Sequence, residues 1–439
     1  MKDARRVAAE ALMRQEKNGY ANLVLKSVLA QWKASAQEKA LAAAVFYGTV
    51  ERMATIDWIL QQFLAKPLEK ADPSVRAVLR SGLYQGRWMD SVPVHTAVDE
   101  SVKLCKRMGK GSAAGLVNAV LRKAVVYDMQ QAVFSSEAQR LAVTYSVSRP
   151  MAEFLLQKLP EDAEAFLRAS FEKPEFCVRV NPLKTDTETL QNVFQEQGMG
   201  CRKGQVEGAL LVDWRGSLTE CEAFRQGWFH VQGQSSQLAC AALDAGPHQK
   251  VVDLCAAPGG KSALLAQNMN NTGKLFCRDV SESRTKLIEE TLERLGVTNA
   301  QVKAADAAEW DEALADADRV LCDVPCSGLG TLAKKPDVRY KSLEGMDELI
   351  AVQKKILETG ARYVKPGGIL VYSTCTVNPD ENQHVVADFL SRHSDFELQM
   401  FDVPQWARRT PQGVLVCPPC RQADGFFIAK LQKRVPQMR

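Results

Sequence analysis

Two cysteines in the last third of the chain are candidates for covalent chemistry. Cys326 lies in Asp323-Val-Pro-Cys-Ser-Gly-Leu-Gly330, and Cys375 lies in Ser373-Thr-Cys-Thr376. A short apolar stretch typical of a buried strand precedes each of these turns. Because the C-terminal ends of parallel strands meet at one edge of an α/β sheet, we expect both thiols in one crevice. A thiolate in that position can attack a bound substrate.

A glycine-rich run upstream of both cysteines predicts a ligand-binding loop. The run is Asp253-Leu-Cys-Ala-Ala-Pro-Gly-Gly-Lys261, between a strand predicted at 250–254 and a helix predicted to begin at Ser262. Adjacent glycines let the backbone approach a ligand closely. The run lacks the G-x-G-x-x-G of a dinucleotide site, and Cys255 stands where a P-loop has its first glycine. Neither of these two phosphate-binding motifs is therefore predicted.

Acidic residues after the next two predicted strands indicate a nucleoside ligand. Asp279 ends a strand predicted at 274–279, about 20 residues after the loop, where a carboxylate can accept hydrogen bonds from ribose hydroxyls. Asp306 follows a strand predicted at 300–303 and could bond an adenine amino group. Taken singly, each is more readily interpreted as an ordinary loop residue. The ordered set of loop, first acid and second acid favours the nucleoside.

The hydrophobic periodicity predicts a multidomain protein of three parts. Residues 1–132 are rich in Ala and Leu at spacings of three and four, which predicts an all-α domain. Residues 145–235 predict a small α/β module. From 236 to 439, strands alternate with helices, which predicts a Rossmann-like α/β domain with a doubly wound, mostly parallel sheet. Its last helix is expected to run to about Arg392, with Asn378 as its N-cap.

Composition and charge limit the class of protein and its partners. The 439 residues are 46% hydrophobic and 25% charged, as in ordinary globular proteins. No apolar run reaches the roughly 18 residues of a membrane helix, and no signal-like segment opens the chain. Twelve cysteines without such a signal indicate reduced thiols in the cytoplasm. Residues 1–140 carry a net charge of about +8 and the rest about −4. This asymmetry fits a polyanion partner and a chance scatter of surface charges equally well.

One basic helix face in the first domain could contact phosphates. A helix predicted from Val94 to about Met108 leads into a glycine-rich turn at 109–112. Four basic residues follow the spacing i, i+3, i+4 and i+7 there: Lys103, Lys106, Arg107 and Lys110. Such a face suits contacts to a nucleic-acid backbone, and an ordinary solvated helix surface is the alternative.

The remaining cysteines give no prediction of a metal site. Cys417-Pro-Pro-Cys420 has the spacing of a zinc knuckle, but no second pair and no suitably spaced histidine accompanies it. We expect two packed thiols there and no bound metal. Cys255, Cys277 and Cys322 fall on or beside predicted core strands, where cysteine behaves as a small hydrophobic residue.

Taken together, the motifs resemble a known family. The runs 253–261, 323–326 and 373–376 are similar to the signature motifs of S-adenosylmethionine-dependent RNA cytosine-carbon-5 methyltransferases, the NOL1/NOP2/Sun family. Residues 1–132 resemble a NusB-type RNA-binding domain. This combination is similar to the family members that methylate cytosine 967 of 16S rRNA. One departure is Gly233, where the family usually has Asp, so no polar role carries over to that position.

The resemblance implies a mechanism and a set of site residues. Cytosine carbon-5 is a poor nucleophile, and addition of a thiolate to carbon-6 makes it enamine-like. Cys375 would make that addition, Cys326 would assist product release, and Asp323 would contact the N3/N4 edge of the cytosine. Since an ordinary thiol of pKa about 8.5 is mostly protonated at pH 7, we expect the site to lower that value.

The resemblance also implies the cofactor and the partner. S-adenosylmethionine would be bound by Cys255, Ala256, Ala257, Pro258, Gly259, Gly260, Lys261, Asp279, Asp306 and Asp323. The partner would be 16S rRNA, free or partly assembled, gripped by the basic helical domain and the small module. We expect the protein to be a monomer and to have no membrane partner.

Three alternatives stay open at this point. Cys326 could be the attacking residue, as in DNA cytosine methyltransferases, but the Glu-Asn-Val of those enzymes is absent and Cys375 would then be idle. The same chemistry could act on another rRNA cytosine or on tRNA. A non-catalytic NusB-like factor in ribosome assembly or antitermination is the third, although it predicts loss of the loop or of one cysteine.

Overall fold

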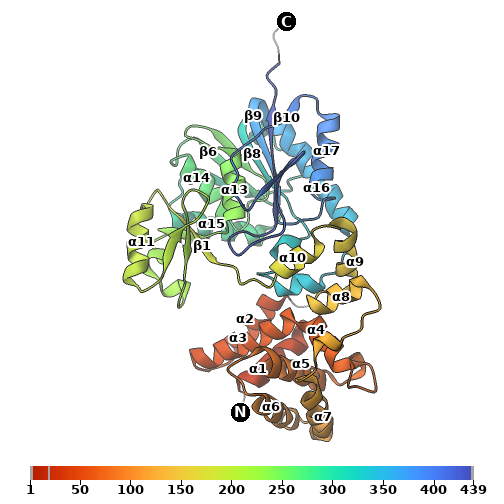
Figure 1. Ribbon diagram of the computed structural model, residues 1–439. Helices are drawn as coiled ribbons and strands as arrows, with labels where there is room; N and C mark the ends of the chain where they lie inside the picture. Colours follow the sequence, from red (N-terminus) through yellow and green to blue (C-terminus); the bar gives the residue numbers. More distant parts are fainter. Residues whose placement is uncertain (1–2, 18–19, 437–439) are drawn as a thin grey trace. The chain divides into compact units, whose positions relative to one another are not determined.

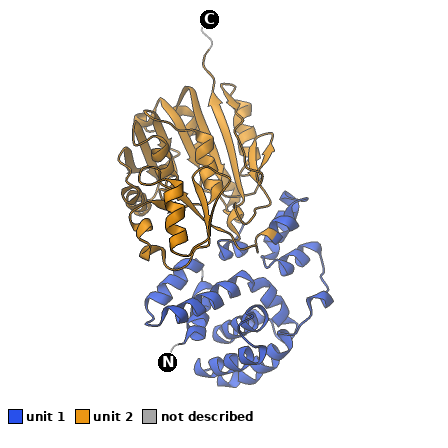
Figure 2. Ribbon diagram, turned by 60° about the vertical axis from the view of Figure 1, so that its left-hand side comes forward, with its two compact units in different colours: residues 1–168, 334–343 blue, residues 169–333, 344–439 orange. Residues whose placement is uncertain are grey.

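The computed structural model describes residues 3–17 and 20–436, and the chain divides into two compact units (Figure 2). Residues 1–168 and 334–343 form the first, here called the helical unit. Residues 169–333 and 344–439 form the second, the sheet unit, which contains both the small module and the large sheet. The finer division into three domains stays a prediction. Within the described ranges, no helix is long and apolar enough to span a bilayer.

The helical unit is built from amphipathic helices with recognisable caps. Ser35 and Glu38 form a reciprocal capping box at the start of α3, and Asp72 caps α5 just before Pro73. The helices are α1 (Ala4–Gln15), α2 (Ala21–Ala30), α3 (Ala36–Glu51), α4 (Met53–Gln61), α5 (Pro73–Trp88), α6 (Val94–Arg107), α7 (Ala114–Ala124), α8 (Glu137–Thr144), α9 (Arg149–Lys158) and α10 (Ala163–Ala169). Short 3₁₀ turns lie at η1 (Leu68–Lys70), η2 (Gly111–Ala113) and η3 (Met129–Gln131).

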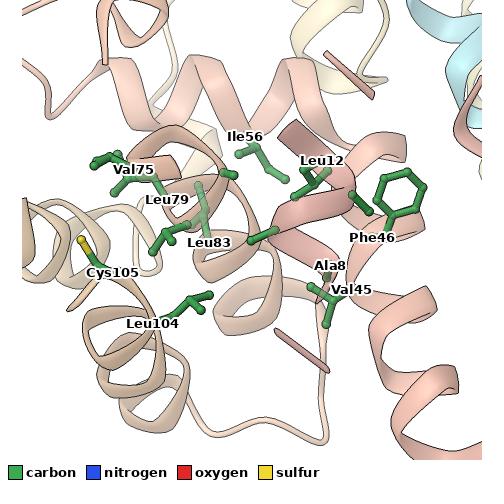
Figure 3. Close-up of a cluster of buried hydrophobic side chains, with 14 of the residues drawn as sticks. Ala8, Leu12, Val45, Phe46, Ile56, Val75, Leu79, Leu83, Leu104 and Cys105 are labelled. Atoms are coloured by element: carbon green, nitrogen blue, oxygen red, sulfur yellow. The ribbon is translucent and has the colours of Figure 1, made fainter. Parts of the chain in front are cut away.

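The core of the helical unit surrounds α5. Val75, Leu79 and Leu83 lie at i, i+4 and i+8 on this helix, so they form one buried stripe. They belong to one cluster with Leu12 of α1 and Ile56 of α4, and Figure 3 shows these side chains close together. The predicted all-α fold of this part of the chain is confirmed.

A segment from far along the sequence completes the helical unit. Residues 334–343 follow β8 in the chain, yet they pack among α3, α4 and α8 through the short 3₁₀ helix η7 (Pro336–Tyr340). Arg339 is fully buried, and its guanidinium donates to the carbonyl oxygen of Tyr145 at 3.0 Å. The Tyr340 hydroxyl lies 2.9 Å from Ser146 Oγ and accepts from the Ala54 amide at 3.3 Å. The sequence pattern gave no sign of this insertion.

The small module of the sheet unit is an antiparallel sheet of order β2-β3-β1-β4. Aromatic side chains form its core, with the rings of Phe194 and Phe229 5.4 Å apart in an edge-to-face contact. Its elements are β1 (Phe176–Val180), α11 (Thr187–Glu196), β2 (Cys201–Lys203), β3 (Ala209–Val212), η4 (Leu218–Glu220), α12 (Glu222–Arg225) and β4 (Phe229–Val231).

The large sheet has the order β11-β12-β13-β9-β8-β5-β6-β7, with β10 pairing on β13. Strands β9, β8, β5, β6 and β7 run parallel, while β10 to β13 form an antiparallel edge. Helices α13, α14 and α15 pack in a row on one face, and α16 and α17 pack together on the other (Figure 1). The predicted doubly wound, mostly parallel sheet is confirmed.

The elements of this domain have the following bounds. The strands are β5 (Lys250–Asp253), β6 (Lys274–Asp279), β7 (Ala300–Ala304), β8 (Ala317–Asp323), β9 (Val364–Thr374), β10 (Phe396–Leu398), β11 (Arg408–Thr410), β12 (Gly413–Val416) and β13 (Phe426–Lys433). The helices are α13 (Gln234–Leu243), α14 (Gly260–Asn268), α15 (Glu282–Leu295), η5 (Glu312–Leu314), η6 (Leu329–Thr331), α16 (Met346–Tyr363) and α17 (Gln383–Arg392).

The predicted start of the last helix was wrong. Helix α17 begins at Gln383, and Asn378 lies in the preceding turn, where its side-chain oxygen accepts from the Asp380 amide at 3.2 Å. The same turn carries Glu381, whose buried carboxylate accepts from the Asn378 side-chain amide at 3.1 Å. The Asn-Pro pair therefore begins a turn, a role that Asn also favours because its side chain bonds the backbone two residues on.

Removing the Tyr340 hydroxyl should weaken the start of α4. Arg52, at the N-cap position of α4, gives no side-chain cap, so the first amides of that helix depend on Ser146 Oγ and on Tyr340. We expect Tyr340→Phe to cost about 1 kcal/mol locally and to speed amide exchange at Ala54 about fivefold. Hydrogen-exchange mass spectrometry would measure this, with Tyr20→Phe at an exposed position as the control. Equal exchange in both variants would contradict the capping role.

Candidate functional site

The predicted loop and acidic residues lie where the strand order of the parallel sheet reverses. Strand β5 pairs with β6 on one side and with β8 on the other, and all three run parallel. From β5 the chain moves outward through β6 to β7, then returns to β8 and β9. Ligands of doubly wound sheets bind beyond the strand C-termini at this switch point. The loop after Asp253, the end of β6 at Asp279 and the end of β8 at Asp323 all meet this edge.

The loop between β5 and α14 has no room for side chains at its two glycines. Gly259 has a φ of +98°, and a Cβ there would lie 3.1 Å from the Ile288 Cα. A Cβ on Gly260 would lie 2.8 Å from His230 Nε2. The Ala256 amide donates to the carbonyl of Arg278 in β6 at 2.8 Å, which fixes the loop on the sheet edge. The residues expected to cradle a ligand are thus held in one rigid turn.

Asp279 and Asp306 take different positions beside this loop. Asp279 is buried, and its carboxylate accepts from the Ala257 amide at 3.3 Å and from the Ser281 amide at 3.1 Å. Asp306 is exposed after β7 and accepts from the Ala308 amide at 2.9 Å. The structure therefore joins Asp279 directly to the loop, while Asp306 lies in the neighbouring turn with a free face toward solvent.

Asp323 forms the centre of a polar network at the end of β8. Its carboxylate lies 2.7 Å from Lys261 Nζ and accepts from Ser373 Oγ at 2.8 Å. Burial disfavours the charge on Lys261, but the Asp323 carboxylate holds the pKa of Lys261 above its ordinary value. Below them, Asp253 accepts from Ser262 Oγ at 2.7 Å, and burial raises the pKa of Asp253 to about 7. The sequence did not predict the pairing of Lys261 with Asp323.

The two candidate cysteines are brought together. Cys326 Sγ lies 3.3 Å from Cys375 Sγ, well beyond the roughly 2.05 Å of a disulfide, so two half-buried thiols are in contact. The Gly330 amide donates to the Cys375 carbonyl at 3.0 Å, which ties the two turns together. The hydrogen bond with Cys375, then burial and nearby negative charge, raise the pKa of Cys326 well above its usual value. The expected lowering of a thiol pKa thus does not apply to Cys326.

The other core cysteines are shielded from chemistry. Burial raises the pKa of Cys240 and Cys277 to about 12 and that of Cys255 well above the ordinary value. Since only the thiolate is nucleophilic, these residues act as small hydrophobic groups. Cys326 and Cys375, by contrast, combine partial exposure with a direct sulfur contact.

A buried arginine behind the loop was missed by the sequence analysis. Arg179 in β1 is buried and donates to the Gly260 carbonyl at 2.8 Å and to the Gln232 side chain. Burial, then the charges of Arg179 and Arg294, lower the pKa of His230 to about 3, so this ring is neutral. A charged residue in the otherwise apolar run 176–180 was the available signal. These contacts attach the small module to the start of α14.

The four basic residues predicted to bind RNA do not form one open face. Lys110 lies beyond the end of α6 and pairs with Asp72 at 2.6 Å, which corrects the predicted i+7 position on that helix. Lys103 pairs with Glu100 at 2.8 Å, and Arg107 pairs with Asp3 at 2.7 Å. Lys106 is exposed. Binding of RNA by these residues stays a prediction. The acidic partners of Lys103, Arg107 and Lys110 reduce the net positive charge of this surface.

Comparison with known proteins decides the family. The probable ribosomal RNA small subunit methyltransferase B of Bacillus subtilis is 34% identical to this chain, and the alignment covers 98% of each. A family model described as 16S rRNA methyltransferase RsmB/F matches residues 240–432. The chain belongs to the RsmB/F family of 16S rRNA methyltransferases. The inferred resemblance to a small-subunit rRNA methyltransferase with a NusB-like domain is confirmed.

Further matches cover the rest of this RsmB/F family member. A NusB family model matches residues 2–125, and a ferredoxin-like domain of RsmF/B-like methyltransferases matches 151–218. Ribosomal RNA small subunit methyltransferase B of Pectobacterium atrosepticum is 31% identical over 91% of both chains. The crystal structure of PH0851 shares 26% identity over 98% of both chains with a TM-score of 0.81. A methyltransferase homologue from Pyrococcus horikoshii is 29% identical over 68% of this chain and all of its own, with a TM-score of 0.61.

The position where this chain departs from the family pattern is the start of a helix. Gly233 is the N-cap residue of α13, and its backbone carbonyl accepts from the Ser236 amide at 3.1 Å. Asp is a preferred N-cap residue because its carboxylate bonds the first free amides, and Gly is also tolerated there. The Asp that the resemblance leads us to expect at position 233 would therefore cap α13, a role that Gly fills without a side-chain hydrogen bond.

A methyl group on the loop should strain it. We expect Gly259→Ala to destabilise the sheet unit by about 1–2 kcal/mol, because φ is positive and the added Cβ meets the backbone of α15. Gly246→Ala is the matched control, since its Cβ would meet nothing within 4 Å and its φ lies outside the left-handed region. Differential scanning calorimetry of both variants measures the difference. Equal unfolding temperatures would show that the loop is not held as described.

Proposed function

We propose that this chain methylates carbon-5 of a cytosine in 16S rRNA, cytosine 967, through a covalent bond between Cys375 and carbon-6. The observation that carries the proposal is the pair of thiols in contact, 3.3 Å apart, at the ligand-binding edge of a methyltransferase sheet. The relatives named as small subunit rRNA methyltransferases support the choice of RNA. The substrate is free or partly assembled 16S rRNA in the cytoplasm.

The loop after β5 fits S-adenosylmethionine, which when bound supplies an electrophilic methyl group. The absence of side chains at Gly259 and Gly260 lets the turn pack tightly against α15 and His230, where a Cβ would collide, and so fixes the backbone beside the strand ends. Asp279 already accepts from two backbone amides and has Arg284 Nη1 3.4 Å from Oδ1, so Oδ2 keeps a second lone pair for a ribose hydroxyl. Asp306 is exposed near the end of the next strand, where it would accept from the adenine amino group.

Cys375 is the better candidate for the attacking thiolate. The hydrogen bond between the sulfurs is the first cause that raises the pKa of Cys326, so an ionised Cys375 would have a proton donor beside it. As the bond from sulfur to carbon-6 forms, the carbon-5–carbon-6 π electrons shift into the ring and carbon-5 becomes nucleophilic. Asp323, fixed by Lys261 and Ser373, accepts from the N4 amino group and orients the ring.

The same contact explains how Cys326 becomes a base after methyl transfer. Once Cys375 is bonded to carbon it no longer accepts a hydrogen bond or carries charge, and these were two of the causes that raise the pKa of Cys326. Cys326 can then ionise and take the proton from carbon-5. The carbon-6–sulfur bond breaks with its electron pair returning to Cys375, and the ring double bond reforms.

A target cytosine must leave its stack to meet these sulfurs. Carbon-6 is attacked from above the ring face, and stacked neighbours cover that face in a helix, so the base must be in a loop or flipped.

Methylation of protein-free 16S rRNA from cells lacking the activity tests the proposal, with 5-methylcytosine mapped by bisulfite sequencing. We expect modification at cytosine 967, its loss in Cys375→Ala and its retention in Cys221→Ala. Methylation elsewhere would correct the substrate, and RNA binding without methylation would support the non-catalytic alternative.

Loss of charge at the end of β6 should weaken cofactor binding. We expect Asp279→Asn to bind S-adenosylmethionine about 10- to 100-fold more weakly, because hydrogen bonds to a charged acceptor contribute about 1.5–3 kcal/mol. Isothermal titration calorimetry measures the affinity, and Asp395→Asn at an exposed position is the control. An unchanged affinity in Asp279→Asn would remove this residue from the proposed cofactor site.

A further inference from the structure

Glu381 carries a buried carboxylate that is surrounded by neutral hydrogen-bond donors. One oxygen accepts from the Ser327 amide at 2.8 Å and from Gln353 Nε2 at 2.9 Å. The other accepts from Ser327 Oγ at 2.5 Å and from Asn378 Nδ2 at 3.1 Å. Burial of an ionised carboxylate is costly unless its lone pairs are filled, and here four donors fill them. Because a buried carboxylate contributes little net stability even when its lone pairs are filled, we look for its role at the neighbouring site.

The donors to Glu381 belong to the three segments that surround the thiols. Ser327 directly follows Cys326, and its hydroxyl also lies 2.7 Å from Thr376 Oγ1, next to Cys375. Gln353 of α16 donates to the Pro325 carbonyl at 2.9 Å as well, so it holds the same turn from the other side. The Tyr372 hydroxyl donates to the Glu381 carbonyl at 2.6 Å and anchors the turn after β9. Glu381 is thus the common acceptor that joins both cysteine turns.

We propose that Glu381 is a positioning residue that holds the Cys326 turn against the Cys375 turn, so that the two sulfurs stay in hydrogen-bond contact. This inference rests on the proposed function, in which Cys375 attacks and Cys326 releases the product. None of the three sequence motifs includes Glu381, which lies six residues after Cys375 and does not contact the substrate in this scheme. Its role is exerted through Ser327, whose amide and hydroxyl it fixes.

The negative charge of Glu381 also acts on Cys326, in addition to the hydrogen bonds that position its turn. The hydrogen bond with Cys375 is the first cause that raises the pKa of Cys326, followed by burial and by the charges of Cys375 and Glu381, whereas the Gly328 amide favours the thiolate. Burial, and then Cys326, in turn raise the pKa of the nearby Tyr372 phenol. Removal of the Glu381 charge should therefore lower the pH at which Cys326 ionises.

The experiment compares Glu381→Gln with the adjacent Asp380→Asn, whose carboxylate bonds the exposed His384. Treatment with diamide joins two thiols in contact as a disulfide, and peptide mass mapping quantifies the bond between Cys326 and Cys375. We expect Glu381→Gln to slow this reaction about 10- to 100-fold, as a small displacement of reacting atoms does, and Asp380→Asn to leave it unchanged. In a Cys375→Ala background, Glu381→Gln should also shift the alkylation of Cys326 by iodoacetamide to lower pH.

A second variant separates position from charge and guards against simple unfolding. Glu381→Asp keeps the charge but is one methylene shorter, so it should slow disulfide formation while the alkylation profile stays near that of the parent. With RNA, Glu381→Gln should accumulate the covalent complex through slow release. Parent-like disulfide and alkylation behaviour in Glu381→Gln would overturn the inference. Both thiol readouts need no RNA, so they remain decisive even if the parent enzyme fails to methylate 16S rRNA.

Discussion

The parallel pairing of β8 with β9 is the constraint on which the site depends. Asp323 lies opposite Ser373 in this register, and the Ser373 hydroxyl donates to the Asp323 carboxylate at 2.8 Å. Because the side-chain period of a strand is two, a slip of one residue would turn Asp323 to the opposite face and separate the turns that follow. Cys326 lies three residues beyond one member of this pair and Cys375 two beyond the other. Their sulfur contact is therefore a consequence of strand register.

Buried polar groups around the strand ends hold the turns that follow this register in place. Lys261 holds Asp323 from the cofactor loop, Glu381 holds Ser327 from the turn after β9, and Arg179 holds the Gly260 carbonyl from the small module. Each is buried or partly buried with several partners, so loss of any one leaves others unsatisfied. The low dielectric of this region also strengthens the interaction between the two sulfurs.

The sequence predicted the site to the extent that local patterns determine it. The binding edge of the sheet was predictable because each of its features is contained in one strand-to-turn unit. These features are the short apolar strands followed by Asp323 and Cys375 and the paired glycines at 259 and 260. Long-range contacts left no such pattern: the insertion of Arg339 and Tyr340 among the helices and the pairing of Lys261 with Asp323 link distant segments. Asn378 was misplaced because the same residue favours both a helix cap and a turn. The charge pattern near Lys110 could not reveal Asp72, which lies far away in sequence.

The identity of the attacking cysteine is tested most directly by trapping the covalent complex. Cys326→Ala, Cys375→Ala and the double variant are incubated with unmethylated 16S rRNA and S-adenosylmethionine, then separated on a denaturing gel. The arrangement of the thiols predicts that Cys326→Ala retains a protein–RNA adduct, because the bond from Cys375 forms but is not released. Cys375→Ala and the double variant should give none. An adduct in Cys375→Ala and none in Cys326→Ala would contradict the assignment and make Cys326 the nucleophile.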